Sequence, residues 1–232
     1  MDQSSTVKSV LITGCSSGIG LCLAKGLKQK GYQVFATARS DIDVEKLKNL
    51  GFDAYQLDLS SSVSIQRAMS HVYEKVGLYG LIHNGAYGQV GALEDISRQA
   101  LEAQFQTNVF GWHELTNLVL AKMKANNQGR IIYLSSVLGF VAMPFRGSYN
   151  ASKFAIEGLV NTLRLELSNT NIQLALIQPG PIESKFRKNA YQAFKRNVDM
   201  DASDYQHSYQ QMIKRLNTDK LAAYTFCLQK QY

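Results

Sequence analysis

The sequence contains few of the features that stabilise secreted or membrane-spanning proteins. It has only three cysteines, at positions 15, 22 and 227, which are too scattered for a disulfide framework and favour a reducing compartment. No uninterrupted apolar run approaches the roughly 18–20 residues that a membrane-spanning helix requires. The first six residues also lack the basic start and apolar core of a secretory signal. We therefore expect a cytoplasmic protein without a transmembrane segment.

Long runs of one charge are absent as well, although the net charge is +7. Nine Lys and Arg residues but only four Asp and Glu residues fall in 185–232, so this segment carries +5. A basic segment can meet nucleic acid, an anionic membrane surface or an acidic partner. No run reaches the five or six like charges that mark such binding arms, so we favour a solvated helical surface and expect no nucleic-acid partner.

The pattern of the 232 residues predicts one large α/β domain spanning 1–232. Short β-branched runs alternate with longer helical segments, which indicates a doubly wound parallel sheet with helices on both faces. We predict strands at Val7–Thr13, Gln33–Thr37, Asp53–Leu57, Leu81–His83, Arg130–Ser135 and Ile172–Gln178. We predict helices at Gly18–Lys30, Asp43–Asn49, Val63–Val76, Arg98–Asn126 and Ser148–Ser168. Residues 191–232 are helical only in patches, around Met212–Leu216 and Leu221–Leu228, and contain no clear further strand.

A glycine-rich turn follows the first predicted strand. Gly14, Gly18 and Gly20 lie between that strand and an amphipathic helix. Glycines in this position allow a tight turn and close approach of the backbone to a pyrophosphate. The start of the helix offers free N–H groups to the same anion. Ordinary turns also use glycine, but the strand before and the helix after favour a dinucleotide site.

The pattern Thr13-Gly14-x-x-x-Gly18-x-Gly20 resembles the cofactor loop of the short-chain dehydrogenase/reductase family. The resemblance extends from about Val7 to Ser184 and implies a Rossmann-like fold. It also implies hydride transfer between a nicotinamide cofactor and a carbonyl/alcohol substrate. Within the loop, it assigns Ser16, Ser17 and Ile19 to cofactor binding together with the three glycines.

The turn after the second strand predicts which nicotinamide cofactor is used. An NAD enzyme needs a carboxylate here for the ribose hydroxyls, whereas a 2′-phosphate needs a positive charge. The segment ends Ala-Thr-Ala-Arg39-Ser, and arginine suits a phosphate because its planar fork binds in a bidentate way. NADP(H) is therefore favoured over NAD(H), although arginines at strand ends are common on surfaces. By resemblance, Asp58, Leu59 and Asn84 also contact the cofactor; Asp58 is equally compatible with a turn or helix cap.

Tyr149 and Lys153 are the predicted reacting pair. Their spacing of four residues places both side chains on one helix face, with Cβ atoms about 5–6 Å apart. A free tyrosine has a pKa near 10, and a neighbouring ammonium is expected to lower it toward the range of efficient proton transfer. Ser136, at the end of the fifth strand, is placed to donate a hydrogen bond to the substrate oxygen. Each residue has an ordinary structural explanation alone, but the three together, downstream of the glycine turn, rarely arise by chance.

Two further segments complete the expected site. Asn108 and Gly111 are poor helix formers in the middle of a long predicted helix, which predicts a local irregularity that frees a carbonyl for water. By resemblance, Asn108 helps to relay protons from Lys153. The turn after the sixth strand supplies Pro179, Gly180, Ile182 and Ser184 to the nicotinamide end, although Pro-Gly also ends strands in ordinary turns. Six turns closely follow predicted strands and therefore share the carboxyl edge, where open parallel sheets bind ligands. They hold residues 14–20, Arg39, Asp58, Asn84, Ser136 and 179–184.

The sequence departs from the family pattern in two places. Where the family usually has Asn-Asn-Ala-Gly, this chain reads His83-Asn84-Gly85-Ala86. If the last position needs a positive φ, Ala86 would cost roughly 1–2 kcal/mol. We expect a structural role for His83, and the other histidines show no metal-ligand spacing, so no metal is predicted. The second departure is the absence of a recognisable seventh strand, which leaves 185–232 as the substrate-covering or C-terminal segment.

The favoured interpretation is an NADP(H)-dependent oxidoreductase that acts on a small-molecule carbonyl or alcohol. An apolar substrate is expected, with candidate lining residues Phe140, Val141, Met143, Phe145, Phe186 and Phe194, although core packing explains several of them equally well. The alternative is a non-enzymatic NADP(H)-binding sensor or interaction protein of the same fold. By resemblance, the long helices 98–126 and 148–168 are surfaces on which relatives pair, which implies a homodimer or homotetramer.

Overall fold

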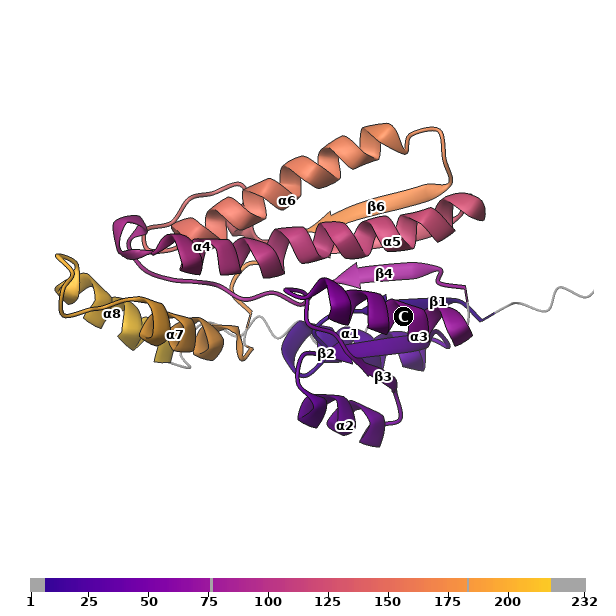
Figure 1. The fold of residues 1–232 in the computed structure, drawn as a ribbon, viewed down its shortest axis with the longest axis horizontal. Coiled ribbons are helices and arrows are strands. Elements are labelled where there is room, and N and C mark those ends of the chain that lie inside the picture. The colour runs from indigo at the N-terminus through magenta and orange to yellow at the C-terminus, as the bar shows by residue number, and fades with distance from the viewer. Residues whose placement is uncertain (1–6, 76, 183, 218–232) are drawn as a thin grey trace, which may run out of the picture.

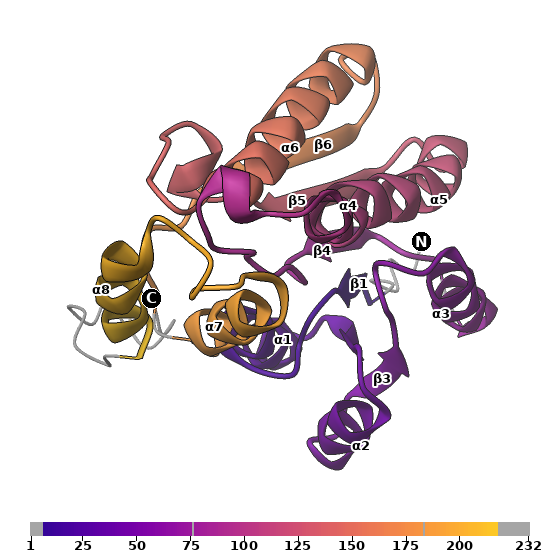
Figure 2. The same cartoon turned by 60° about the vertical axis from the view of Figure 1, so that its left-hand side comes forward.

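The structure, a computed structural model, describes residues 7–217 except 76 and 183. A six-stranded sheet has the strand order β3-β2-β1-β4-β5-β6, and every neighbouring pair is parallel. Figures 1 and 2 show helices on both sides of this sheet, with α1 and α3 on opposite sides of β1. The predicted doubly wound, Rossmann-like α/β fold is therefore confirmed.

The six predicted strands and five predicted helices are found close to their expected bounds, with one helix divided. The strands are β1 (Ser9–Ile12), β2 (Gln33–Ala38), β3 (Asp53–Gln56), β4 (Gly80–His83), β5 (Gly129–Leu134) and β6 (Ile172–Ile177). The first helices are α1 (Gly18–Gln29), α2 (Asp41–Asn49) and α3 (Ser62–Lys75). The later helices are α4 (Arg98–Phe105), α5 (Gly111–Ala125), α6 (Gly147–Glu166), α7 (Phe186–Asn197) and α8 (Gln206–Asn217). Two short 3₁₀ helices cover Leu93–Asp95 and Val137–Gly139.

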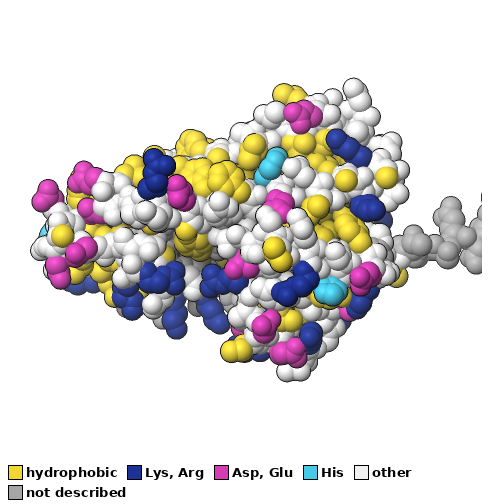
Figure 3. Space-filling view, viewed as in Figure 1, with side chains coloured by type: hydrophobic (Ala, Val, Ile, Leu, Met, Phe, Trp, Pro, Cys, Tyr) yellow, Lys and Arg dark blue, Asp and Glu magenta, His cyan; other side chains and the backbone are white. Residues whose placement is uncertain are grey.

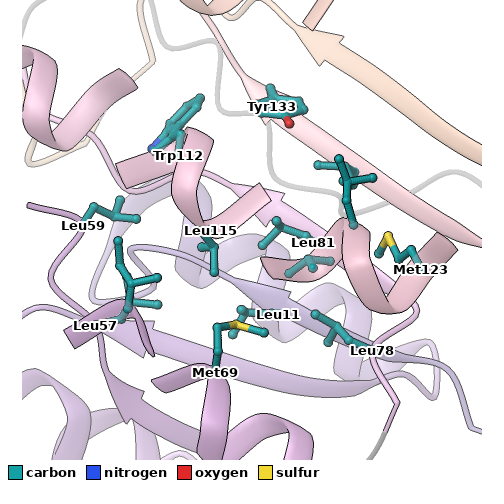
Figure 4. Close-up of a cluster of buried hydrophobic side chains, with 14 of the residues drawn as sticks. Leu11, Leu57, Leu59, Met69, Leu78, Leu81, Trp112, Leu115, Met123 and Tyr133 are labelled. Atoms are coloured by element: carbon teal, nitrogen blue, oxygen red, sulfur yellow. The ribbon is translucent and has the colours of Figure 1, made fainter. Parts of the chain in front are cut away.

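Alternating strand residues supply two apolar cores, one on each face of the sheet. Leu11, Phe35 and Leu81 pack with α3, α5 and α6 in the larger core, part of which is shown in Figure 4. Their neighbours Val10 and Ile12 pack on the other face with α1 and α2. Because both faces of the central strands are covered, β1 and β4 are buried along their whole length, and Val10–Ile12 and Leu81–Ile82 read as continuous hydrophobic runs.

The predicted irregularity in the long helix is confirmed. Residues 106–110 form a π-helical segment between α4 and α5, and Asn108 lies in its middle. At Gly111 the helix approaches the loop after β3 so closely that a Cβ atom would lie 1.9 Å from the carbonyl oxygen of Leu59. The π-helical turn and Gly111 are therefore adjacent, at the point where the helix packs against the loop that contains Leu59.

Helices α7 and α8 form a separate apolar cluster with the loop at 90–96. Tyr209, Phe194 and Met212 are its buried centre, together with Val90 and Ala92. In both views α7 and α8 lie side by side, on the side toward which β4 and β6 point (Figures 1 and 2). The patch predicted around Met212–Leu216 is confirmed as part of α8, whereas Leu221–Leu228 lies outside the described residues.

Strand β6 forms one edge of the sheet, because the described residues contain no seventh strand. Ile172 is buried, whereas Gln173, Ala175 and Ile177 are exposed on the other face. No helix within 7–217, gaps aside, is both long enough and apolar enough to cross a membrane.

Candidate active site

The glycine-rich turn is held to the end of β4 by a compact set of hydrogen bonds. The Asn84 side-chain amide donates to the carbonyl oxygens of Thr13 and Gly14, at 2.9 and 2.8 Å. In return, Thr13 Oγ1 accepts from the backbone N–H groups of Asn84 and Gly85, both at 2.9 Å. The Asn84 side-chain amide therefore holds the backbone of the glycine-rich turn in place. The direct contact with the cofactor that the sequence predicted for Asn84 stays a prediction.

The conformation of this turn fits a dinucleotide pyrophosphate. Gly14 and Gly18 have φ values of +71° and +58°, which favour glycine, and a Cβ atom on Gly20 would lie 2.3 Å from the Gly14 carbonyl oxygen. Ser17 precedes α1 but its side chain makes no capping hydrogen bond, and the first turn contains no acidic residue. The N–H groups at the start of α1 can therefore hold a phosphate, and the residues present fit the cofactor predicted for them.

The turn after β6 reaches both the glycine loop and the Ser136 segment. Gly18 and Ser184 are so close that a Cβ on the glycine would lie 3.0 Å from the serine Cβ. On the other side, Val137 N–H donates to the Pro179 carbonyl oxygen at 3.2 Å. The predicted cofactor segments 14–20 and 179–184, apart from residue 183, therefore meet at one edge of the sheet.

Arg39 and Asp58 lie at the other end of this edge. Arg39 is exposed and follows β2, and the end of this strand is tied to the glycine loop because Cys15 N–H donates to the Thr37 carbonyl oxygen at 2.7 Å. Asp58 Oδ1 accepts from Ser60 N–H and from the Ser60 hydroxyl, at 2.9 and 2.7 Å. The turn role considered for Asp58 is therefore present, and an adenine contact stays a prediction.

Tyr149 and Lys153 are both buried on α6, with the Lys153 Nζ 5.7 Å from the centre of the tyrosine ring. Lys153 donates to the carbonyl oxygen of Leu134 at the end of β5, at 2.7 Å. The predicted Ser136 is the neighbour of the phenol, to which it is hydrogen bonded. The three residues that the sequence singled out are therefore brought together at the carboxyl end of β5.

The pKa of Tyr149 differs from the expectation. Burial raises it to about 12, and the hydrogen bond with Ser136 opposes this rise only in part. Burial also lowers the pKa of Lys153 to about 7, which the Glu157 carboxylate partly opposes. The expectation that the ammonium would lower the phenol pKa is wrong for this structure, because burial raises the Tyr149 pKa and Ser136, rather than the Lys153 charge, opposes the rise.

Trp112 is a contact of Lys153 that the sequence did not reveal. The ammonium lies 4.3 Å from the centre of an indole ring, and Trp112 Nε1 donates to the Gly85 carbonyl oxygen at 2.8 Å. Because the indole is fully buried and fixed by this bond, it gives the lysine a cation–π partner without a counter-charge. Two features of the sequence could have pointed to Trp112: it follows Asn108 by one helical turn, and it is the single tryptophan of the chain.

His83 lies behind this tryptophan in the core. Its ring stacks on Trp112 and Tyr133, with centroids at 5.1 and 4.7 Å, and Nε2 is 2.8 Å from Thr116 Oγ1. Burial, aided by the nearby Lys153 charge, lowers the pKa of His83 to about 3, so the ring is neutral. The structural role expected for this histidine agrees with these contacts.

Asn108 joins the π-helical segment to the helix of Tyr149. Its side chain accepts from Tyr87 N–H and donates to the Tyr87 carbonyl oxygen, at 3.2 and 2.9 Å. It also donates to Ser152 Oγ at 3.2 Å, and that hydroxyl donates to the Tyr149 carbonyl oxygen at 2.8 Å. Its amide therefore positions α6, and the proton relay stays a prediction.

The inverted Gly85-Ala86 pair does not strain the backbone. Among the described residues other than glycine, only Asn127 and Phe145 have positive φ values, so the cost considered for Ala86 does not arise. The close approach of this segment to the glycine turn restricts Gly14 instead, because a Cβ atom on Gly14 would lie 2.6 Å from the Gly85 Cα.

The apolar residues considered for the substrate side divide into two groups. The Phe186 ring packs edge-on against Tyr149 at 5.3 Å, and Phe140, Val141 and Met143 are all more than half exposed nearby in the chain. Phe145 and Phe194 instead pack on Tyr209, at 5.6 and 4.9 Å. The prediction that these last two line the cleft is wrong, since they belong to the α7–α8 core.

Comparison with known proteins agrees with this geometry. Residues 8–195 match the family model described as short chain dehydrogenase. The chain belongs to the short-chain dehydrogenase family. It is therefore an oxidoreductase with a nicotinamide dinucleotide site, as the glycine turn and the Ser136–Tyr149–Lys153 set indicated.

Similar proteins and solved structures align with most of the length of this chain. The uncharacterised oxidoreductase YbbO of Escherichia coli is 45% identical over 80% of this chain and 70% of its own length. Human retinol dehydrogenase 8 is 40% identical over 77% of this chain and 60% of its own length. A short-chain dehydrogenase/reductase from Burkholderia phymatum in complex with NAD superposes with a TM-score of 0.80 at 22% identity, over 94% of this chain and 81% of its own.

Proposed function

We propose that the protein is an NADP(H)-dependent oxidoreductase that transfers a hydride between NADP(H) and a largely apolar carbonyl/alcohol substrate. The observation that carries this proposal is the buried set of Ser136, Tyr149 and Lys153 beside the glycine loop. In reduction, a carbonyl compound, NADPH and a proton give an alcohol and NADP⁺.

The chain's own residues would perform the proton chemistry. The cofactor, when bound, supplies or accepts the hydride. Tyr149 would give its phenolic proton to the carbonyl oxygen, while Ser136 donates a hydrogen bond to the same oxygen as negative charge develops. Lys153 would bind the nicotinamide ribose. Asn108 would help to relay a proton from solvent to Lys153, so that the phenol of Tyr149 is protonated again after each turnover.

The acidities support reduction as the favoured direction near neutral pH. With a pKa near 12, the Tyr149 phenol keeps its proton and is a donor rather than a base. With a pKa near 7, Lys153 loses its charge as the pH rises above neutrality. Carbonyl reduction is therefore expected to decline above about pH 7.

The preference for NADP(H) rests on the absence of a carboxylate in the turn after β2 and on Arg39, which is exposed at the end of that strand. Arg39→Gln is expected to lower kcat/KM for NADPH at least tenfold and to leave kcat/KM for NADH nearly unchanged, because only NADPH carries the 2′-phosphate. Steady-state rates with both cofactors on a panel of aldehydes and ketones measure this. Lys25→Gln, which removes an exposed charge on α1, is the control. An equal loss with both cofactors would reject the assignment of Arg39.

A sensor that binds NADP(H) without turnover is the alternative, and the same panel separates the two. The inverted Gly85-Ala86 pair that suggested a damaged loop is unstrained, which favours the enzyme. Tight NADPH binding with no turnover of any carbonyl compound would favour the sensor.

A homodimer or homotetramer in the cytoplasm completes the proposal. Helix α6 exposes Phe154, Leu159 and Leu165, with 46%, 43% and 78% of their surfaces accessible. Apolar side chains on one long helix suit pairing between copies. Light scattering during size-exclusion chromatography measures the subunit number directly.

A further inference from the structure

Glu157 links the helix of the reacting residues to the turn after β6. It lies on α6, one helical turn after Lys153 and two turns after Tyr149. Both of its carboxylate oxygens accept from the side-chain amide nitrogen of Gln178, at 3.0 and 3.1 Å. Gln178 directly follows β6 and begins the turn that leads to Ser184. The Glu157–Gln178 pair therefore joins α6 to the turn that is predicted to hold the nicotinamide.

The same carboxylate also packs against the segment that follows Ser136. A Cβ atom on Gly139, the last residue of the short 3₁₀ helix there, would lie 3.1 Å from both Cγ and Oε1 of Glu157. This segment is itself bonded to the turn after β6, because Val137 N–H donates to the Pro179 carbonyl oxygen at 3.2 Å. Three segments of the site, α6, the turn and the Ser136 segment, therefore meet around one carboxylate.

The turn after Gln178 has little local means of fixing its own position. Pro179 and Pro181 have no backbone N–H group to donate, and Gly180 lacks the Cβ atom that restricts the backbone of other residues. Leaving out its chain neighbours, no described residue comes within 4 Å of the place where a Gly180 Cβ atom would be. An anchor on the side chain of Gln178 therefore influences where this turn lies.

An acidic residue on a helix surface is ordinary in itself, and Figure 3 shows Asp and Glu side chains spread over one face of the molecule. Glu157 differs because it is partly buried, both oxygens are hydrogen bonded, and its charge opposes the burial that lowers the pKa of Lys153. The other titratable groups that face this lysine, Tyr149 on α6 and His83 on β4, are neutral near pH 7, and Trp112 on α5 carries no charge.

We propose that Glu157 is a positioning residue for the cofactor, which through Gln178 holds the nicotinamide turn against the helix of Tyr149 and Lys153. It touches no reacting atom and acts through these neighbours. The inference rests on the proposed function, because it gives the Glu157–Gln178 pair a task in placing the nicotinamide. Its effects are therefore expected in NADPH affinity and in the pH range of reduction.

Exchanging the two side chains tests the pair. Gln178→Glu brings two carboxylates together, and we expect it to raise Kd for NADPH about fivefold, because repulsion replaces a charged hydrogen bond. The double variant Glu157→Gln/Gln178→Glu again has one carboxylate and one amide, so its Kd should return to within about twofold of wild type. Gln173→Glu, which adds the same charge to an exposed position of β6, is the control and should bind like wild type. Fluorescence titration with NADPH measures all four proteins.

The pH profile provides a readout that a merely structural contact would not change. Glu157→Gln removes the negative charge near Lys153 but keeps the shape of the side chain and an acceptor for Gln178. The decline of carbonyl reduction above neutral pH should therefore move to lower pH by about half a unit or more, because the ammonium loses its proton more readily. Glu166→Gln, which removes an exposed charge from the same helix, should not move it.

Hydrogen exchange separates this inference from the proposed function, because it needs neither cofactor nor turnover. The Gly180 and Ile182 N–H groups should exchange about threefold faster in Gln178→Glu and return toward the wild-type rate in the double variant. Exchange rates and NADPH affinities that follow this pattern, without turnover of any carbonyl compound, would reject the oxidoreductase and support the pair. A double variant no closer to wild type than Gln178→Glu, or an unshifted pH profile in Glu157→Gln, would overturn the proposal and leave the oxidoreductase standing.

Discussion

At the scale of single residues, the buried lysine is surrounded by neutral aromatic groups. Lys153, Trp112, His83 and Tyr133 follow one another through the core, and His83 Nδ1 has no hydrogen-bond partner within the described residues. A protonated imidazole here would lie near the lysine charge in a poorly solvated place. The stack therefore requires His83 to remain neutral.

This requirement predicts a pH dependence of stability. The pKa of His83 falls from 6.5 to about 3 on folding. Between these values only the unfolded chain binds the proton, so the free energy of unfolding should fall as the pH decreases through this window. Relative to His83→Asn, the wild-type slope should be steeper by up to about 1.4 kcal/mol per pH unit. Urea unfolding at a series of pH values measures both slopes.

His113→Asn is the matched control, because it removes an exposed histidine from α5. It should retain the wild-type slope. Parallel slopes for wild type and His83→Asn would show that the buried ring is protonated in the folded protein, which contradicts the stack as described.

At the scale of secondary-structure elements, the π-helical segment lets one long helix serve both the core and the site. It carries Asn108 toward Tyr87 and Ser152, while Gly111 lets α5 approach the Leu59 loop. The contacts of Asn108 and the close packing at Gly111 thus fall within four consecutive residues. Their proximity explains why the segment from 98 to 125 is divided at this point.

Two glycine substitutions separate packing from helix propensity. Gly111→Ala should lower the free energy of unfolding by about 3 kcal/mol, because the methyl group would overlap a backbone carbonyl. Gly158→Ala, in α6 with nothing within 4 Å of the new Cβ, should raise it by up to about 1 kcal/mol. Denaturant unfolding of both variants provides the comparison. Equal effects of the two changes would be inconsistent with the close approach at Gly111.

Sequence patterns predicted the elements better than the contacts between them. The strands, the glycine turn and the Tyr149–Lys153 spacing are local signals, and each is found where it was expected. The contact between Trp112 and Lys153 depends on packing between α5 and α6, which no local pattern encodes. Phe145 and Phe194 were misassigned for the same reason, since an aromatic residue fits a cleft or a core equally well.

At the scale of the whole molecule, α7 and α8 are attached to the sheet through the loop at 90–96. The Tyr209 hydroxyl donates to the Asp95 carboxylate and accepts from Ala92 N–H at 2.8 Å. Ser203 Oγ donates to the same carboxylate at 2.6 Å.

Tyr209→Phe should therefore loosen α7 and α8 while the sheet stays folded. Loss of the hydroxyl leaves two buried or half-buried groups without this partner, at a cost of about 1–3 kcal/mol. Hydrogen exchange should quicken in α7 and α8 but not in β1 or β4. Tyr191→Phe, on a half-buried tyrosine of α7, is the control. Uniform acceleration over the whole chain would contradict a locally attached unit.

The central claim, that the Tyr149 phenol is the proton donor beside a bound nicotinamide cofactor, is tested most directly by Tyr149→Phe. We expect the variant to bind NADPH within about twofold of wild type and to lose carbonyl reduction by about 10²–10⁴-fold, because only the proton donor is removed. Fluorescence titration with NADPH and single-turnover rates on the same samples measure both quantities. Unchanged turnover in the variant, with binding intact, would contradict the account.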